Sequence, residues 1–158
     1  MGQLRTILVG TLLCLTIWVL PASAALQNHS HGDLKGQDFS NASLVGGMFL
    51  SAEMHDANFS NTDLTGAIFT KGVLLRANLQ GADLTNSLVD QATLDEADLT
   101  NAILVGATMT RTRFFGTKVT GADFTDALID RSQVKLLCTV ANGTNPRTGI
   151  DTRESLGC

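Results

Sequence analysis

A large apolar residue recurs at every fifth position of this chain from Leu34 to Ile129, without interruption. The residue two positions before it is usually small, most often alanine. A period of five fits neither an α-helix, which repeats every 3.6 residues, nor a strand, which repeats every two. The spacing instead predicts a backbone that turns once in five residues around one interior, which is a solenoid. The twenty central residues are Leu34, Phe39, Leu44, Phe49, Met54, Phe59, Leu64, Phe69, Leu74, Leu79, Leu84, Val89, Leu94, Leu99, Leu104, Met109, Phe114, Val119, Phe124 and Ile129.

Short segments within this series match the pattern A(D/N)LXX, for example Ala57-Asn58-Phe59-Ser60-Asn61 and Ala97-Asp98-Leu99-Thr100-Asn101. They resemble the pentapeptide-repeat family, and the resemblance extends over roughly two thirds of the chain. The resemblance implies an all-β solenoid, a right-handed quadrilateral β-helix of about five coils. Residues twenty apart would then stack, and an outward column of Asn and Gly, which runs from Asn41 to Gly121, would suit tight or left-handed corners.

The sequence predicts four segments. Residues 1–24 are typical of a secretory signal, with Arg5, an apolar run from Ile7 to Leu20 and cleavage after Ala24. Residues 25–31 are expected to form a polar leader with two solvated histidines. Residues 32–136 are assigned to the β-helix, with Val134 as a further candidate centre, and residues 137–158 to a C-terminal cap. An uncleaved anchor is the alternative for the first segment.

The tail is expected to cover the open last coil. Val134, Leu136, Leu137 and Val140 favour a short amphipathic helix. Cys138 and Cys158 are the two cysteines that remain after signal removal, and in an exported chain such a pair favours a structural disulfide. It would close a loop of about 20 residues, worth roughly 3 kcal/mol. The tail also resembles that of thylakoid-lumen pentapeptide-repeat proteins of cyanobacteria and plants, which implies a lumenal location.

Two outward columns on one side of the coil form the candidate interaction surface. The first is apolar and is broken only by Thr108. The second is cationic and is broken only by Gln91. Each has a simpler interpretation, because stacked side chains can pack on their coil neighbours and charges are usually solvated. The candidate residues are Met48, Ile68, Leu88, Leu128, Lys71, Arg111 and Arg131.

The residues favour a function without catalysis. The net charge of −4 argues against a general nucleic-acid-binding surface. No nucleophile–base pair, phosphate-binding loop or metal-ligand cluster is recognisable, so we expect no enzyme activity, cofactor or metal site. The favoured hypothesis is a structural or protein-interaction module of the thylakoid lumen, with the periplasm as the alternative location. It would support photosynthetic complexes. Contact with a membrane surface is compatible with this hypothesis.

Two alternatives remain. Some members of the family that this chain resembles mimic DNA and bind topoisomerases. The acidic charge is compatible with such a function, whereas the export signal argues against it. The other alternative is weak cation binding by Asp95, Glu96 and Asp98.

Overall fold

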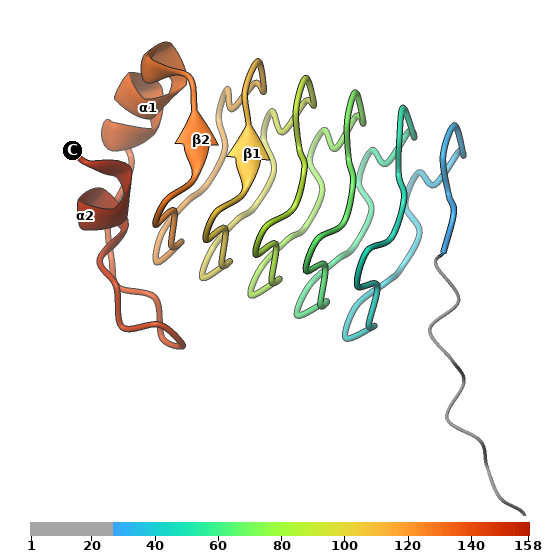
Figure 1. The fold of residues 1–158 in the computed structure, drawn as a ribbon, viewed down its shortest axis with the longest axis horizontal. Helices are drawn as coiled ribbons and strands as arrows, with labels where there is room; N and C mark the ends of the chain where they lie inside the picture. Colours follow the sequence, from blue (N-terminus) through green and yellow to red (C-terminus); the bar gives the residue numbers. More distant parts are fainter. Residues whose placement is uncertain (1–26) are drawn as a thin grey trace, which may run out of the picture.

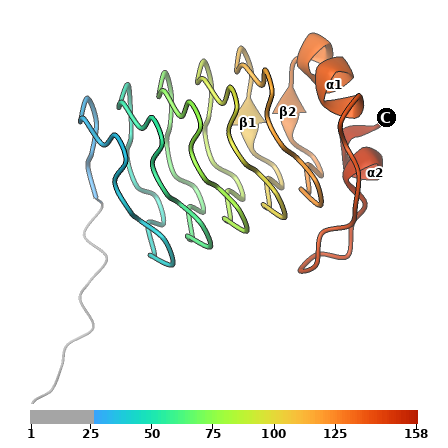
Figure 2. The same ribbon diagram turned by 180° about the vertical axis from the view of Figure 1, so that it is seen from behind.

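The computed structural model describes residues 27–158, so the expected signal segment lies outside the described residues. The chain winds into a four-sided coil with two short helices at its C-terminal end (Figures 1 and 2). Parallel backbone bridges join each side to the residue twenty positions later, as between Asp38 and Asn58. The bridged sides reach strand length only where β1 (Thr108–Met109) pairs with β2 (Leu128–Ile129). The five-residue period is therefore confirmed as a β-solenoid.

Each side ends in a residue with left-handed backbone. Thirteen of these corner residues are not glycine, and their φ angles lie close to that of Asn101, at 59°. Where the residue before a centre is Asp or Asn, it supports the turn, because its carboxylate or amide oxygen accepts a hydrogen bond from the backbone amide two residues on. Asp83, for example, accepts bonds from the amide of Thr85 at 3.0 Å and from its hydroxyl at 2.6 Å. The sequence shows that Asp and Asn are frequent at the position before the centre, but only the structure shows the hydrogen bond that explains this preference.

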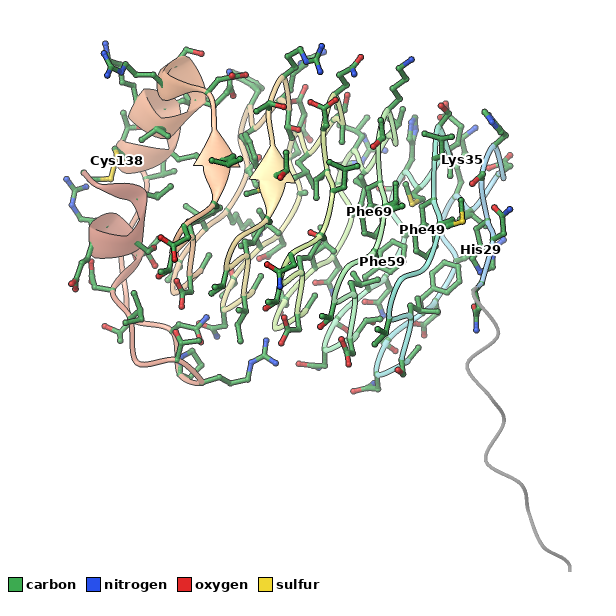
Figure 3. The ribbon with its side chains drawn as sticks, viewed as in Figure 1. His29, Lys35, Phe49, Phe59, Phe69 and Cys138 are labelled. Atoms are coloured by element: carbon green, nitrogen blue, oxygen red, sulfur yellow. A yellow bond between two sulfur atoms is a disulfide. The ribbon has the colours of Figure 1, made fainter. Side chains whose placement is uncertain are left out.

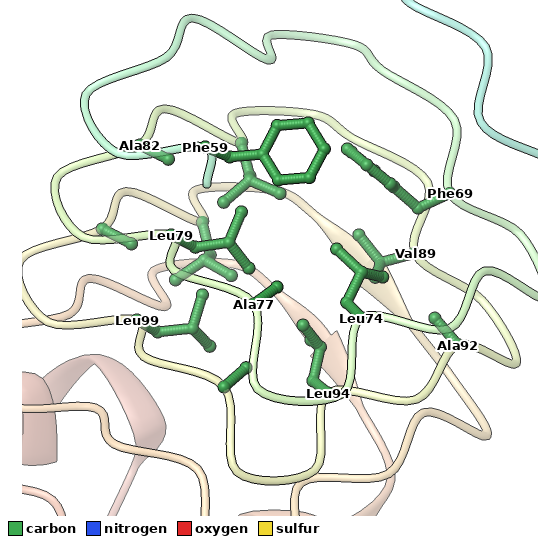
Figure 4. Packing of buried hydrophobic residues seen from close by; sticks show 14 of the residues in the cluster. Phe59, Phe69, Leu74, Ala77, Leu79, Ala82, Val89, Ala92, Leu94 and Leu99 are labelled. Atoms are coloured by element: carbon green, nitrogen blue, oxygen red, sulfur yellow. The ribbon is translucent and has the colours of Figure 1, made fainter. Parts of the chain in front are cut away.

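The interior holds one large side chain per repeat and a small residue beside it (Figure 4). Phenylalanines dominate the N-terminal coils. Phe49 stacks on Phe69 with ring centroids 4.8 Å apart, and Phe39 stacks on Phe59 at 4.9 Å. The two stacks face each other edge to face, as Phe59 and Phe69 do at 6.0 Å and 88°. This aromatic geometry is favourable, and the four rings of Phe39, Phe49, Phe59 and Phe69 form one connected cluster in the core.

The coil begins earlier than the sequence pattern predicts. The polar leader assigned to residues 25–31 is wrong from Gln27 onward, because His29 occupies the centre of a further repeat. Its amide donates to the carbonyl of Met48 at 2.7 Å, and its ring stacks on Phe49 at 5.3 Å. A flat imidazole can continue an aromatic stack, which a search for apolar centres does not detect.

The coil also ends earlier, because α1 spans Arg131–Cys138. The boundary at residue 136 is therefore wrong, and Val134 lies in α1. The carboxylate of Asp130 accepts a bond from the amide of Arg111 at 2.7 Å, which holds the turn into the helix. Leu137 is buried on the last coil. No helix among residues 27–158 is long and apolar enough to cross a membrane.

The cap continues into α2 (Thr152–Leu156), whose first turn is capped by the carboxylate of Asp151. A disulfide joins Cys138, at the end of α1, to Cys158. Leu156 is buried, and the hydroxyl of Ser155 accepts a bond from the amide of Phe124 at 3.0 Å. The two helices thus cover the open edge of the last coil.

Candidate interaction surfaces

The apolar column of the candidate surface is a continuous ladder. Parallel bridges join Met48 to Ile68, Ile68 to Leu88, and then Leu88 through Thr108 to Leu128. Met48 and Ile68 are half-buried, whereas 38% of Leu88 and 60% of Leu128 are exposed. Packing between coils therefore accounts for the N-terminal part of this ladder, and its C-terminal part is open to a partner. We call these residues the Met48–Leu128 ladder.

The three cations beside the ladder differ in their surroundings. Lys71 is exposed at a corner and makes no ion pair with another described residue. Arg111 pairs with Asp90 at 3.0 Å. Hydrogen bonds, above all from the hydroxyl of Thr110 and then from Gln91 and Arg111, hold the pKa of Asp90 below its usual range. Arg131 is exposed at the start of α1.

The acidic stretch considered for cation binding is not a ligand set. Successive sides of the coil point in different directions, so neighbouring carboxylates diverge. Asp95 pairs with Arg113, and Asp98 pairs with Lys118 at 3.3 Å. Within residues 27–158, no group of three or more His, Cys, Asp or Glu side chains could hold a metal ion.

A polar groove of about 450 Å³ lies where the cap loop folds back along the coil. Arg147 forms one wall, and its guanidinium donates to the carbonyl of Gly81 at 2.7 Å. The other wall consists of hydroxyl and amide side chains, including those of Ser60, Asn78 and Thr100. This lining contains no histidine, cysteine or carboxylate, so it offers neither a general base nor a strong nucleophile.

Three exposed apolar residues near the C-terminal end are missing from the candidate surface. Phe115 is 68% exposed, and Val140 and Leu136 are 51% and 38% exposed. A pocket of about 240 Å³ opens between Leu136, Val140 and the last coil. The repeat places Phe115, which follows the central Phe114, on the outside of the coil, but the positions of Leu136 and Val140 depend on α1 and on the segment after it.

The chain is similar to one protein family and to several solved structures. The model of pentapeptide repeats matches residues 33–70, 52–91 and 92–130, with eight copies. A solved pentapeptide-repeat protein from the thylakoid lumen of Arabidopsis thaliana is 41% identical, with a TM-score of 0.81. That alignment covers 82% of this chain and 90% of the other.

A second solved structure shows a likeness of fold alone. QnrB1, a plasmid-mediated fluoroquinolone resistance protein, is 18% identical, with a TM-score of 0.54. The alignment covers 71% of this chain and 69% of that chain. No curated protein matches the chain.

Proposed function

Because the chain belongs to the pentapeptide-repeat family, whose members form right-handed quadrilateral β-helices, we propose that it is a non-catalytic protein-interaction module of the thylakoid lumen. The observation that carries this proposal is the 41% identity to a lumenal protein over 90% of that protein's length. The Cys138–Cys158 disulfide supports an oxidising compartment outside the cytosol. The likeness favours the lumen over the periplasm.

The geometry suits docking better than catalysis. The sides are flat ladders over an interior that is filled by apolar side chains, so the coil has no enclosed substrate cavity among its described residues. The docking surface is the Met48–Leu128 ladder together with Lys71, Arg111 and Arg131. It fits a protein that presents an apolar strip flanked by acidic groups, and a component of a photosynthetic complex is the partner class that we infer. The likeness to QnrB1 is one of fold alone and carries no argument for topoisomerase binding.

The compartment is tested by fractionation of the native cells and by N-terminal sequencing of the isolated protein. We expect a lumenal protein that begins at Ala25. A cytoplasmic protein with an intact N-terminus would overturn the lumenal assignment.

The docking surface is tested by crosslinking the tagged protein in the lumenal fraction. The variant Lys71→Glu/Leu88→Ser removes one free cation and one exposed apolar side chain from the surface. The matched control Val45→Ser/Lys35→Glu makes the same types of change elsewhere, since Val45 is 47% exposed and Lys35 is also exposed. We expect one partner to be lost only in the first variant. Retention of every crosslinked protein in both variants would exclude this surface.

A further inference from the structure

The ion pairs between coils all have the same direction. In each of the four, the cation lies one coil nearer the C-terminal end than its carboxylate. The pairs are Asp56 with Arg76, Asp90 with Arg111, Asp95 with Arg113, and Asp98 with Lys118. Charge is therefore separated along the axis of the coil.

The formal charges of the described residues show the same separation. Residues 27–106 carry three cations against ten acids, a net charge of −7. Residues 107–158 carry seven cations against five acids, a net charge of +2. Figure 3 shows nitrogen-tipped side chains above β1 and around α1, and it shows Lys35 near the opposite end. The C-terminal end is thus the cationic end of an acidic protein.

In the last three pairs the carboxylate side chain is mostly buried, whereas the side chain of its cation is exposed. The Arg113 side chain is 68% exposed and that of Asp95 only 10%. The Lys118 side chain is 70% exposed and that of Asp98 only 16%. An approaching molecule therefore meets the cations first. Lys135 adds an exposed cation from α1 that has no ion pair among the described residues.

Exposed apolar side chains lie among these cations. Phe115 follows Arg113 by two positions on the same side of the coil. Leu136 and Val140 border the apolar pocket, which Lys118 also lines. Three of the six exposed large apolar residues of the described chain lie in this region. We call it the cap corner, and define it as Arg113, Phe115, Lys118, Lys135, Leu136 and Val140.

We propose that the cap corner binds the surface of an anionic lipid bilayer. Cations next to exposed aromatic and aliphatic side chains are the chemistry of interfacial membrane contact, in which apolar groups enter the headgroup boundary and cations meet anionic headgroups. Charge complementarity supports this occupant, because the acidic remainder of the protein is repelled by the same surface and so directs the cationic end toward it. The contact would leave most of the Met48–Leu128 ladder free for a protein partner.

The test measures co-sedimentation of the mature protein with vesicles of known composition. One set is phosphatidylcholine alone, and the other contains about one third phosphatidylglycerol. The variant Phe115→Ser/Lys135→Glu removes the most exposed apolar side chain and the unpaired cation of α1. The control is again Val45→Ser/Lys35→Glu, and circular dichroism shows whether each variant is folded.

We expect binding to the anionic vesicles only, reduced at least roughly tenfold by the cap-corner variant and by high salt, and unchanged in the control. Absence of binding to anionic vesicles, or an equal loss in both variants, would overturn the proposal. Self-association that the cap-corner variant abolishes, without vesicle binding, would assign the surface to a second copy instead. Failure here leaves the lumenal protein-docking proposal untouched, because that proposal is tested with different residues.

Discussion

The side-chain amide oxygen of Asn61 lies over Gly81 on the next coil, 2.5 Å from the position that a β-carbon of residue 81 would take. Asn86 lies over Gly106 in the same way, at 2.6 Å. Gly81 is also a left-handed corner with φ +64°. Two separate features therefore favour glycine at this corner: the left-handed backbone, which non-glycine corners adopt at some cost, and the space that the asparagine fills.

Comparison of alanine substitutions at Gly66 and Gly81 separates the cost of the left-handed backbone from the cost of the clash with asparagine. At Gly66, which has φ +66° and no atom near the β-carbon position, the Gly66→Ala change should lower the free energy of unfolding by about 1 kcal/mol. Gly81→Ala should cost roughly 2–3 kcal/mol, because the added methyl also clashes with Asn61. Urea denaturation of both variants measures the difference. Equal costs, or no relief when Asn61→Gly is added to Gly81→Ala, would contradict the steric part.

Asn145 anchors the cap loop to the coil. Its side chain is fully buried, and its amide donates to the carbonyls of Asn101, Ala102 and Gly121 at 2.9–3.2 Å. Asn145→Ala should lower the free energy of unfolding by roughly 2–4 kcal/mol, because buried carbonyls lose their donor. Asn145→Asp should cost more, since a carboxylate would face those carbonyls. The control is Asn142→Ala, at an exposed position of the same loop, which should lower the free energy of unfolding by well under half as much. Thermal melting compares the two variants. Similar melting temperatures for Asn142→Ala and Asn145→Ala would refute the role of Asn145 as an anchor.

The Cys138–Cys158 disulfide ties the last residue of the chain to the end of α1. Reduction should lower stability by about 3 kcal/mol, the amount expected for a closed loop of this length. It should also increase self-association, because a loosened α2 uncovers the edge of the last coil. Thermal melting and analytical ultracentrifugation with and without reductant measure both effects. As a control, the Cys158→Ser variant should melt at the temperature of the reduced protein, and reductant should not change that temperature. An unchanged melting temperature of the wild type after reduction would contradict the capping role of the disulfide.

Asp123 should make stability depend on pH. Burial acts to raise the pKa of this carboxyl, but hydrogen bonds from Thr125 and Thr148 outweigh burial and hold the pKa below its ordinary value of 3.8. The folded state therefore binds its proton at a lower pH than the unfolded state does. The resulting stabilisation is complete well above about pH 4 and is lost as pH falls through the folded pKa.

The Asp123→Asn variant tests whether the stabilisation by Asp123 decreases as the pH falls. It keeps an oxygen that can accept from Thr125 but has no carboxylate to titrate. Urea denaturation between about pH 7 and pH 3 should show a stability advantage of the wild type that shrinks at the acidic end. A constant difference over that range would show that Asp123 does not act through its charge.

The repeat made most of the fold predictable, because each central residue is repeated in the same environment. Leu84 and its column are buried as the alignment of residues twenty apart predicts. The errors lie at both ends, where no further repeat is available for comparison. His29 is not apolar and yet completes an aromatic stack, and Val134 continues the spacing of five but lies in α1.

The candidate surface was predictable in position but not in exposure. Alignment in steps of twenty correctly places Ile68 beside Leu88, but it does not distinguish a half-buried side chain from an exposed one. The ion pair of Arg111 with Asp90 was also missed, because the two residues are 21 positions apart rather than 20. Such diagonal pairs depend on side-chain rotamers.

The sequence by itself determined a solenoid and the residues of its interior, because a large side chain at every fifth position is buried only if the backbone turns with that period. The four sides of the coil were implied by the resemblance to pentapeptide repeats. The tertiary structure alone decided how the coil is closed and where its surfaces lie. The tail has no repeat, so the positions of α1, Asn145 and Val140 follow from contacts with a coil that must already be formed. Those contacts join residues far apart in the sequence, 44 positions in the case of Asn101 and Asn145, and no local pattern specifies them.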